Sequence, residues 1–245
     1  MNRRRFLLAT AAAFLPPAAA AQDVLEAMRF SALQAGAPLP EWLRPYVFPN
    51  QPRHTQFALV EEEGLTVLRA RAVASTSGLI RSLRVDPQIH PILSWRWKVI
   101  NLPAKGDLAT RAGDDFAARI YVTFDLDPAT LSLGDRLKLA LARTIWGDQL
   151  PAAALCYVWD GRAPVDTIVP NAYTDRVRMV VADSGGAGLG RWVARDRDVA
   201  ADYRRAFGAA PPAITGVIVS ADTDNTGESV ESYFGDIEFR ARRTS

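Results

Sequence analysis

Apolar and polar residues alternate in short runs along most of this chain. From about residue 57 onward these runs are separated by clusters of Gly, Pro, Asp and Asn. Such alternation, broken by regularly spaced turn residues, is typical of the strands of a sandwich or barrel. The expected strands cover 57–60, 65–70, 79–85, 93–99, 117–124, 155–159, 176–181, 191–194, 214–221 and 232–240. The first two strands should be joined by a solvated hairpin turn, Glu61-Glu62-Glu63-Gly64.

The alternation also predicts which side chains face the core. In 93–99 the odd positions are apolar, so Trp95 and Trp97 should point inward while Arg96 and Lys98 point to the other face. The same rule places Arg119 and Tyr121 on the polar face of 117–124. It places Phe234 and Asp236 opposite Ile237 and Phe239 in 232–240. One dry and one polar face per strand is typical of the antiparallel sheets of a sandwich.

Two segments have helical periodicity instead. In the first, Leu133, Leu137, Leu141 and Ile145 recur every four residues between a possible N-cap, Ser132, and Gly147. The second runs from Asp198 to Phe207 and stops at Gly208. Both apolar stripes are expected to pack on a sheet. The predicted fold is therefore mostly β, an antiparallel jelly-roll β-sandwich with two short helices.

The N-terminal residues predict export. Three arginines at positions 3–5 precede an Ala/Leu-rich stretch, and Ala19-Ala20-Ala21 offers a cleavage site. The adjacent arginines followed by Phe6-Leu7 favour a twin-arginine signal over an ordinary secretory one. The apolar run is too short for a transmembrane anchor, which needs about 20 residues. We therefore expect a signal peptide at 1–21 and a single periplasmic domain at 22–245.

Charge and cysteine content narrow the function classes further. The whole chain has 29 Lys+Arg and 27 Asp+Glu, and loss of three arginines with the signal leaves 26 against 27, a charge of −1. This balance gives no footprint for nucleic acid. Cys156 is the only cysteine, so an internal disulfide is excluded, and a buried inert thiol is expected. We expect a monomer.

An Asp-rich loop is the first candidate site. Asp222-Thr223-Asp224-Asn225-Thr226-Gly227 follows a predicted buried strand, and its oxygen donors suit a hard cation such as calcium. It is not a helix-loop-helix calcium loop, because Tyr233 stands where the closing glutamate should be. The alternative is an Asx-rich turn that satisfies its own backbone.

Polar strand faces provide a second candidate. If the strands bearing Lys98, Arg119 and Asp236 are neighbours, their outer faces would form one ligand-binding surface. The residues proposed for it are Arg96, Lys98, Asp114, Asp115, Arg119, Tyr121, Phe234 and Asp236. The alternative is a solvated face with ordinary ion pairs. A hydrolytic version would use Asp115 and Glu231 as paired carboxylates.

Two other sequence features give weaker indications of function. The glycine-rich stretch 185–190 precedes a predicted strand, whereas a phosphate-binding loop needs a helix there, so a hairpin loop is expected. The two histidines, His54 and His90, have no spacing that suggests zinc or a catalytic triad.

Several ordered motifs resemble a known family. They are Leu93 to Lys98, Gly113 to Val122, Asp202 to Gly208, Asp222 to Gly227 and Tyr233 to Ile237. They are similar to a family of exported bacterial proteins with domain of unknown function 3047 (DUF3047). The resemblance implies a jelly roll similar to galactose-binding-like carbohydrate-binding modules, in which the acid equivalent to Asp236 often serves a structural calcium. The predicted metal ligands are then Asp222, Asp224, Asn225 and Asp236.

The expected function is non-catalytic binding of a saccharide or another small polar ligand in the periplasm, with no cofactor other than a possible structural calcium. Two rival classes stay open. One is an enzyme acting on envelope polysaccharide through Asp115 and Glu231. The other is a structural partner in an envelope assembly, with the helix around Leu133–Ile145 as its contact.

Overall fold

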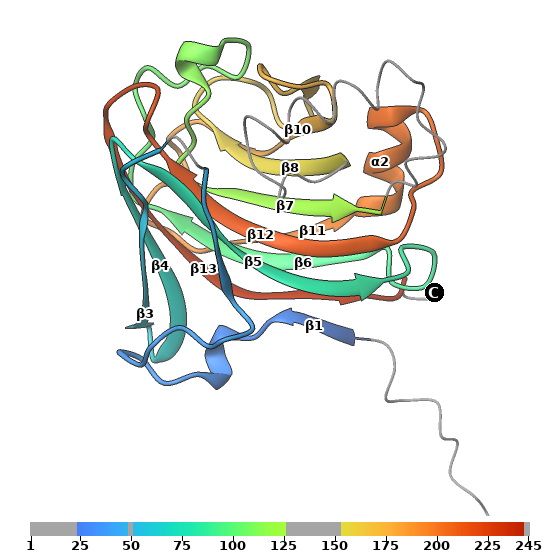
Figure 1. The fold of residues 1–245 in the computed structure, drawn as a ribbon, viewed down its shortest axis with the longest axis horizontal. Coiled ribbons are helices and arrows are strands. Elements are labelled where there is room, and N and C mark those ends of the chain that lie inside the picture. Colours follow the sequence, from blue (N-terminus) through green and yellow to red (C-terminus); the bar gives the residue numbers. More distant parts are fainter. Residues whose placement is uncertain (1–23, 49–50, 126–152, 243–245) are drawn as a thin grey trace, which may run out of the picture.

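The computed structural model describes residues 24–48, 51–125 and 153–242. The expected signal peptide and the expected helix at 133–145 lie outside these ranges. Within them, strands form two sheets that pack face to face (Figure 1). The six-stranded sheet A has the order β11-β6-β13-β4-β3, with β1 paired to β13, and the seven-stranded sheet B has the order β2-β5-β12-β7-β8-β10-β9.

The strands of sheet A are β1 (Val24–Met28), β3 (Gln56–Glu62), β4 (Leu65–Val73), β6 (Ile92–Val99), β11 (Val193–Asp198) and β13 (Ser229–Arg240). Those of sheet B are β2 (Arg44–Tyr46), β5 (Thr76–Val85), β7 (Arg119–Phe124), β8 (Ala153–Asp160), β9 (Ile168–Pro170), β10 (Val177–Ser184) and β12 (Ile214–Asp222). Two 3-10 turns, η1 (Phe30–Ala32) and η2 (Arg111–Gly113), and one helix, α2 (Val199–Phe207), complete the described elements.

Strands that follow one another in sequence repeatedly change sheet. The chain alternates from β4 to β7 and again from β11 to β13. This alternation gives the jelly-roll-like β-sandwich that the sequence predicted. One pair departs from the antiparallel expectation, because β10 runs parallel to β8. The connecting residues between them cross over and place the short β9 antiparallel on the outer side of β10.

The main core lies between the two sheets and is rich in aromatic rings. Trp95 and Trp97 point inward from β6, as their odd positions predicted, and are 3% and 0% exposed. Trp97 packs on Trp159 with 6.0 Å between ring centroids, and its indole Nε1 donates to Asp183 at 2.8 Å. Burial of such side chains stabilises the fold by about 1.5–3 kcal/mol each.

A bulge in β13 overturns one predicted face. The pairing of β13 with β6 shifts register between Phe234 and Ile237. Alternation therefore changes phase, and Phe234, Ile237 and Phe239 are all buried in the core. The extra residue of a bulge re-aims the side chains that follow it. Phe234, 0% exposed, is thus no platform for a ligand, and the prediction that placed it opposite Ile237 and Phe239 is wrong.

The helix α2 forms as its sequence predicted. Asp198 caps it by accepting a hydrogen bond from the Ala201 backbone N–H at 2.9 Å, and Gly208 ends it in the left-handed conformation. Val199 and Tyr203 are buried against the core. In the described part of the chain, no helix has the length and apolar character needed to cross a membrane.

Candidate functional site

A buried arginine connects two loops at one end of sheet B. Arg119 opens β7 and is 2% exposed, and its Nη2 lies 2.6 Å from Oδ2 of Asp222, the last residue of β12. Its Nε donates to Oδ1 of Asp222 at 2.9 Å, while Nη1 donates to Asp114 at 3.2 Å. Burial would lower the pKa of Arg119, but attraction to Asp114 and Asp222 outweighs burial and holds the pKa well above its ordinary value.

Asp115 fixes the loop that follows β12. Its carboxylate is 1% exposed and accepts hydrogen bonds from the backbone N–H groups of Thr226 at 2.6 Å and Asn225 at 3.3 Å. The Asn225 side-chain amide also donates to it, at 3.3 Å. We call Asp114, Asp115, Arg119, Tyr121, Asp222, Asp224 and Asn225 the Arg119 cluster. Two of the motifs that resemble the DUF3047 family, 113–122 and 222–227, therefore meet here.

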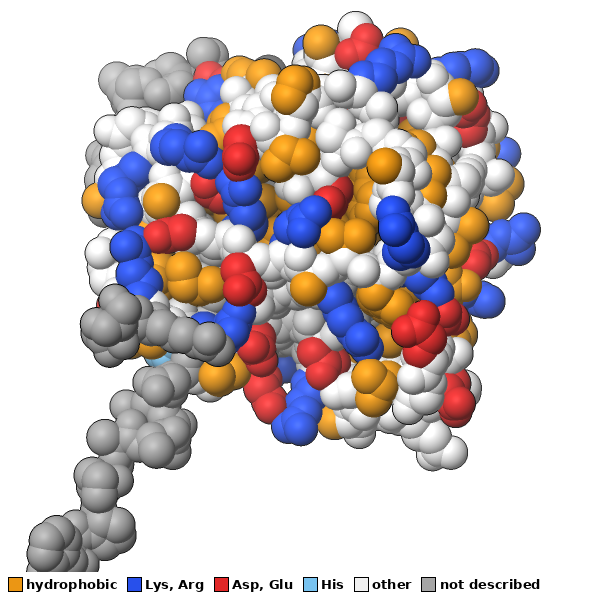
Figure 2. All heavy atoms as spheres, turned by 180° about the vertical axis from the view of Figure 1, so that it is seen from behind, with side chains coloured by type: hydrophobic (Ala, Val, Ile, Leu, Met, Phe, Trp, Pro, Cys, Tyr) orange, Lys and Arg blue, Asp and Glu red, His pale blue; other side chains and the backbone are white. Residues whose placement is uncertain are grey.

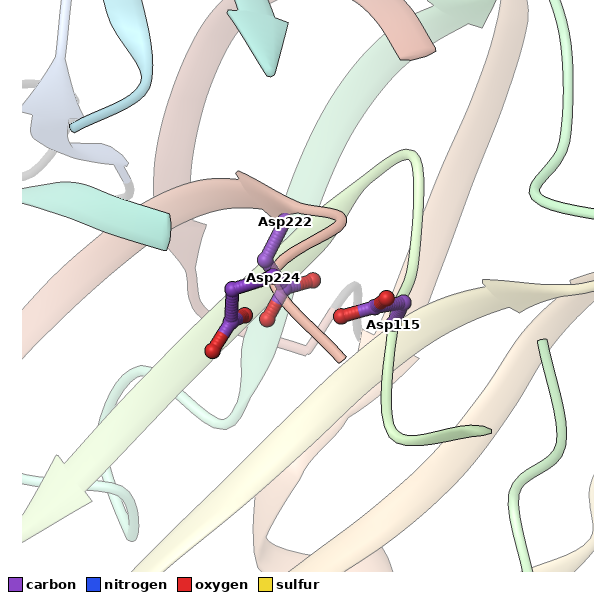
Figure 3. Close-up of side chains that lie close together, drawn as sticks. All are labelled: Asp115, Asp222 and Asp224. Atoms are coloured by element: carbon purple, nitrogen blue, oxygen red, sulfur yellow. The ribbon is translucent and has the colours of Figure 1, made fainter. Parts of the chain in front are cut away.

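Three carboxylates of the Arg119 cluster lie side by side (Figure 3). One oxygen each of Asp115, Asp222 and Asp224 lies within 4.8 Å of the others. Burial raises the pKa of Asp222 to about 7, partly opposed by Arg119 and reinforced by Asp114 and Asp115. Burial and Asp115 also raise the pKa of Asp224. Binding of a proton or a cation can reduce the repulsion between such crowded carboxylates.

The donor set suits a hard cation but differs from the predicted one. Carboxylate oxygens are appropriate calcium ligands, and Asp115 supplies one that the sequence assigned to another site. Asp236 does not join them, because it lies seven residues beyond the start of β13, about 23 Å along the strand. Its carboxylate instead accepts the backbone N–H of Ser31 at 2.8 Å. Calcium at the Arg119 cluster is a proposal.

Two further groups in this region are inert. Burial raises the pKa of Tyr121 well above its ordinary value, and its hydroxyl accepts from Arg119 at 3.3 Å. Burial also raises the pKa of the Cys156 thiol to about 12. A buried thiol with this pKa is no nucleophile at neutral pH, which agrees with the sequence prediction.

A second polar region covers the outer face of sheet A. Arg96 lies 4.5 Å from the centre of the Trp192 ring, and Lys98 lies 5.6 Å from the same ring. On its other side Lys98 lies 5.1 Å from the centre of the Tyr233 ring. Trp192 immediately precedes β11, the neighbour of β6. Two cations and two rings thus form a continuous row, as cation–π attraction favours.

Cross-strand pairing adds more charged residues to this face. Tyr233 of β13 stands opposite both Lys98 and Arg69, and Glu231 stands opposite Arg71. Facing residues of an antiparallel pair point to the same side of the sheet. With Glu62, which pairs with Lys98, they define the aromatic–cation face: Glu62, Arg69, Arg71, Arg96, Lys98, Trp192, Glu231 and Tyr233. The strands β6 and β11 are more distant in Figure 1 and so lie nearer the viewer in Figure 2, where both charges mix with hydrophobic side chains.

The bulge in β13 seats Arg96 on this face. A Cβ at Gly235 would lie 2.5 Å from Cγ and 2.7 Å from Nε of Arg96. The guanidinium stem therefore lies directly on the glycine backbone, which only a residue without a side chain permits. The same bulge that lets Phe234 and Ile237 both face the core thus also makes room for Arg96 beside Trp192.

Hydrogen bonding fixes the Tyr233 ring. Its hydroxyl donates to Glu231 at 2.6 Å. Burial, with this bond and the charges of Glu231 and Glu62, raises the pKa of Tyr233 to about 12. The phenol is therefore neutral at physiological pH and presents a fixed ring.

The structure divides the predicted ligand-binding residues between these two regions. Arg119 and Tyr121 belong to sheet B, whereas Arg96, Lys98 and Asp236 belong to sheet A, so the expected single face does not form. That face required β7 to lie next to β6 and β13. Instead β12 and β8 flank β7. Asp115 and Glu231, the paired acids of the enzyme alternative, belong to separate hydrogen-bond groups, and Asp115 is buried.

Sequence reasoning missed Trp192 as a surface aromatic. The sequence pattern places it in a short strand after the glycine-rich stretch, and that stretch does form a loop before β11. Its neighbours Arg96 and Lys98 lie almost 100 residues away, and only the pairing of β11 with β6 brings them together. The available signal was the pair of cations, Arg96 and Lys98, on alternate positions of 93–99.

These features define a class: a jelly-roll-like β-sandwich domain with a buried acidic cluster at one end and an aromatic and charged outer sheet face. The chain belongs to the family described as protein of unknown function (DUF3047), whose model matches residues 40–238. Among curated proteins, none matches it.

Similar solved structures include two carbohydrate-binding modules of Clostridium thermocellum cellulosomal cellulases. The family 11 module has 8% identity and a TM-score of 0.43, and the match covers 92% of this chain and 99% of that one. The family 30 module has 10% identity and a TM-score of 0.40, covering 90% and 99%. A third, a cellulose induced protein, Cip1, has 12% identity and a TM-score of 0.33, covering 83% and 93%.

Proposed function

We propose that this chain is an exported, non-catalytic binding domain that holds a saccharide or another small polar ligand on the aromatic–cation face. The observation that carries the proposal is the row Arg96, Trp192, Lys98 and Tyr233 on one sheet face. Aromatic rings offer apolar surface to the C–H groups of a sugar, and charged groups hydrogen-bond its hydroxyls. The periplasm is the proposed location, by the predicted export signal.

The geometry supports binding better than hydrolysis. Asp115 directs its carboxylate at the backbone of the loop that follows β12 and is almost inaccessible. A general acid or nucleophile must reach the scissile bond of its substrate. If activity on polysaccharide were found and survived in Asp115→Asn and Glu231→Gln, these residues would be excluded from the mechanism.

A glycan array followed by calorimetry on the purified protein tests the proposal. Trp192→Ala should weaken binding of any saccharide that the array identifies by tenfold or more, roughly 1.4 kcal/mol, because a binding platform is lost. Trp42→Ala is the matched control, since Trp42 also stacks on an arginine, Arg81, at 4.7 Å, but beside β5 of sheet B. Equal losses in both variants, or no binding of any glycan by the wild type, would overturn the proposal.

A further inference from the structure

The buried end of Lys98 is paired with a carboxylate from a distant strand. Lys98 lies on β6 and is 7% exposed, yet its ammonium group contacts Glu62 at the end of β3. Two strands, β13 and β4, lie between β6 and β3 in the sheet. The β3–β4 hairpin must therefore bring Glu62 back over the outer face.

Turn geometry determines where Glu62 stands. Glu62 pairs with Leu65, and the two turn residues, Glu63 and Gly64, have positive φ values of 53° and 77°. Such a two-residue turn fixes the register of its hairpin. The neighbouring Glu61 is exposed, whereas the Glu62 side chain is only 26% exposed. Only one of these adjacent glutamates thus reaches the aromatic–cation face.

Glu62 pairs with one cation of that face, Lys98. Lys98 lies between the Trp192 and Tyr233 rings. Arg69, Arg71 and Arg96 share the face, so four cations stand against Glu62 and Glu231. The face without Glu62 has a still larger positive excess, which favours an anionic ligand.

Resting on the proposed function, we propose that the ligand is an acidic saccharide and that Glu62 holds the place of its carboxylate. A uronic acid presents a planar carboxylate attached to a sugar ring. Its ring would stack on Trp192 or Tyr233 while its carboxylate displaces Glu62 from Lys98. The glutamate therefore acts as an internal competitor that lowers affinity for acidic ligands and leaves neutral ones unaffected.

Calorimetry with two probes tests this inference. A trimer of galacturonic acid is compared with cellotriose, a neutral trisaccharide, on the full protein. Glu62→Gln should raise affinity for the acidic trimer about fivefold to tenfold, because removing a competitor that holds the cation increases the competent fraction. Affinity for cellotriose should stay unchanged. Glu61→Gln, with the same charge change on the same hairpin, should alter neither.

A second measurement on the wild-type protein avoids any loss of stability in the variant. Carboxyl labelling followed by mass spectrometry should show Glu62 becoming more reactive when the acidic trimer binds. Cellotriose should not change it. Unchanged Glu62 reactivity with bound acidic trimer, or equal gains in Glu61→Gln and Glu62→Gln, would overturn the inference.

The two levels of proposal fail differently. In one outcome, cellotriose binding depends on Trp192, the acidic trimer is not preferred, and Glu62→Gln gives no gain in affinity. This outcome would contradict the acidic-ligand inference but support the proposed function. Absence of binding by every saccharide would sink the proposed function itself.

Discussion

The Arg119 cluster and the aromatic–cation face are made from the same residue types and differ in what surrounds them. Each combines arginine, carboxylates and a tyrosine. Arg119 donates to Asp114 and Asp222 in the interior, with each hydrogen bond made to the protein itself. Arg96 instead lies on glycine backbone against one ring at the surface. Burial makes the first group structural, whereas the half-buried Arg96, Trp192 and Tyr233 leave the second group available to a ligand.

Charge and aromatic content alone therefore do not define a binding site. A buried charged pair loses most of its hydration. Hydrogen bonds within the protein must offset this desolvation penalty. A charged group at the surface keeps its hydration and can exchange it for ligand contacts. The two regions should therefore respond oppositely to mutation, one in stability and the other in binding.

The largest effect is expected from Arg119→Met. The change leaves Asp114 and Asp222 buried without their cation, which destabilises a fold by about 3–5 kcal/mol. Urea unfolding measures it. Arg84→Met removes an exposed pair with Asp125 and should cost less than about 1 kcal/mol. Similar losses in the two variants would contradict a structural role for the Arg119 cluster.

The sequence was informative where structure is local and uninformative where it depends on distant pairing. Alternation in 93–99 correctly predicted inward Trp95 and Trp97, because that strand is regular. The phase of β13 was lost at the bulge, whose position depends on pairing with β6. The short strands β1, β2 and β9 were missed, since their few residues carry no period.

The candidate sites show the same limit. Asp115 and Asp222 are 107 positions apart, and their meeting follows from the pairing of β7 with β12. Both loops were recognisable in the sequence as polar candidates, but no local pattern indicated that they lie together. It also grouped Arg119 with Asp236, because alternation says which face a side chain takes and not which sheet its strand joins.

A smaller effect is expected from the titration of Asp222. Its folded pKa of about 7 lies above its ordinary value near 3.9. The folded state therefore holds the proton more tightly, and stability present at low pH is lost as pH rises through about 4 to 7. The loss is on the order of 1 kcal/mol per pH unit. Urea unfolding of wild type and Asp222→Asn at pH 5 and 7.5 should show a larger decline in wild type than in the variant, in which Asp224 still has a raised pKa. Asp125→Asn, an exposed aspartate, should behave like wild type.

Calcium provides a second test of the same carboxylates, because a cation and a proton would compete for the Arg119 cluster. Added calcium should raise the melting temperature of the wild type more at pH 7.5 than at pH 5. The increase should disappear in Asp224→Asn and persist in Asp236→Asn. An equal response at both pH values would count against binding at this cluster.

The smallest effect on stability is expected from Gly235→Ala, which separates the two regions most cleanly. The Gly235 φ value suits any residue, so the new Cβ acts only by displacing the flexible Arg96 side chain. We expect a stability change within about 1 kcal/mol and a loss of saccharide affinity of about threefold to fivefold, the value of one exposed cation–π contact. Gly161→Ala is the control, since nothing lies within 4 Å of its Cβ position. If Gly235→Ala bound saccharide as wild type does, Arg96 would be a solvated neighbour of the site and not part of it.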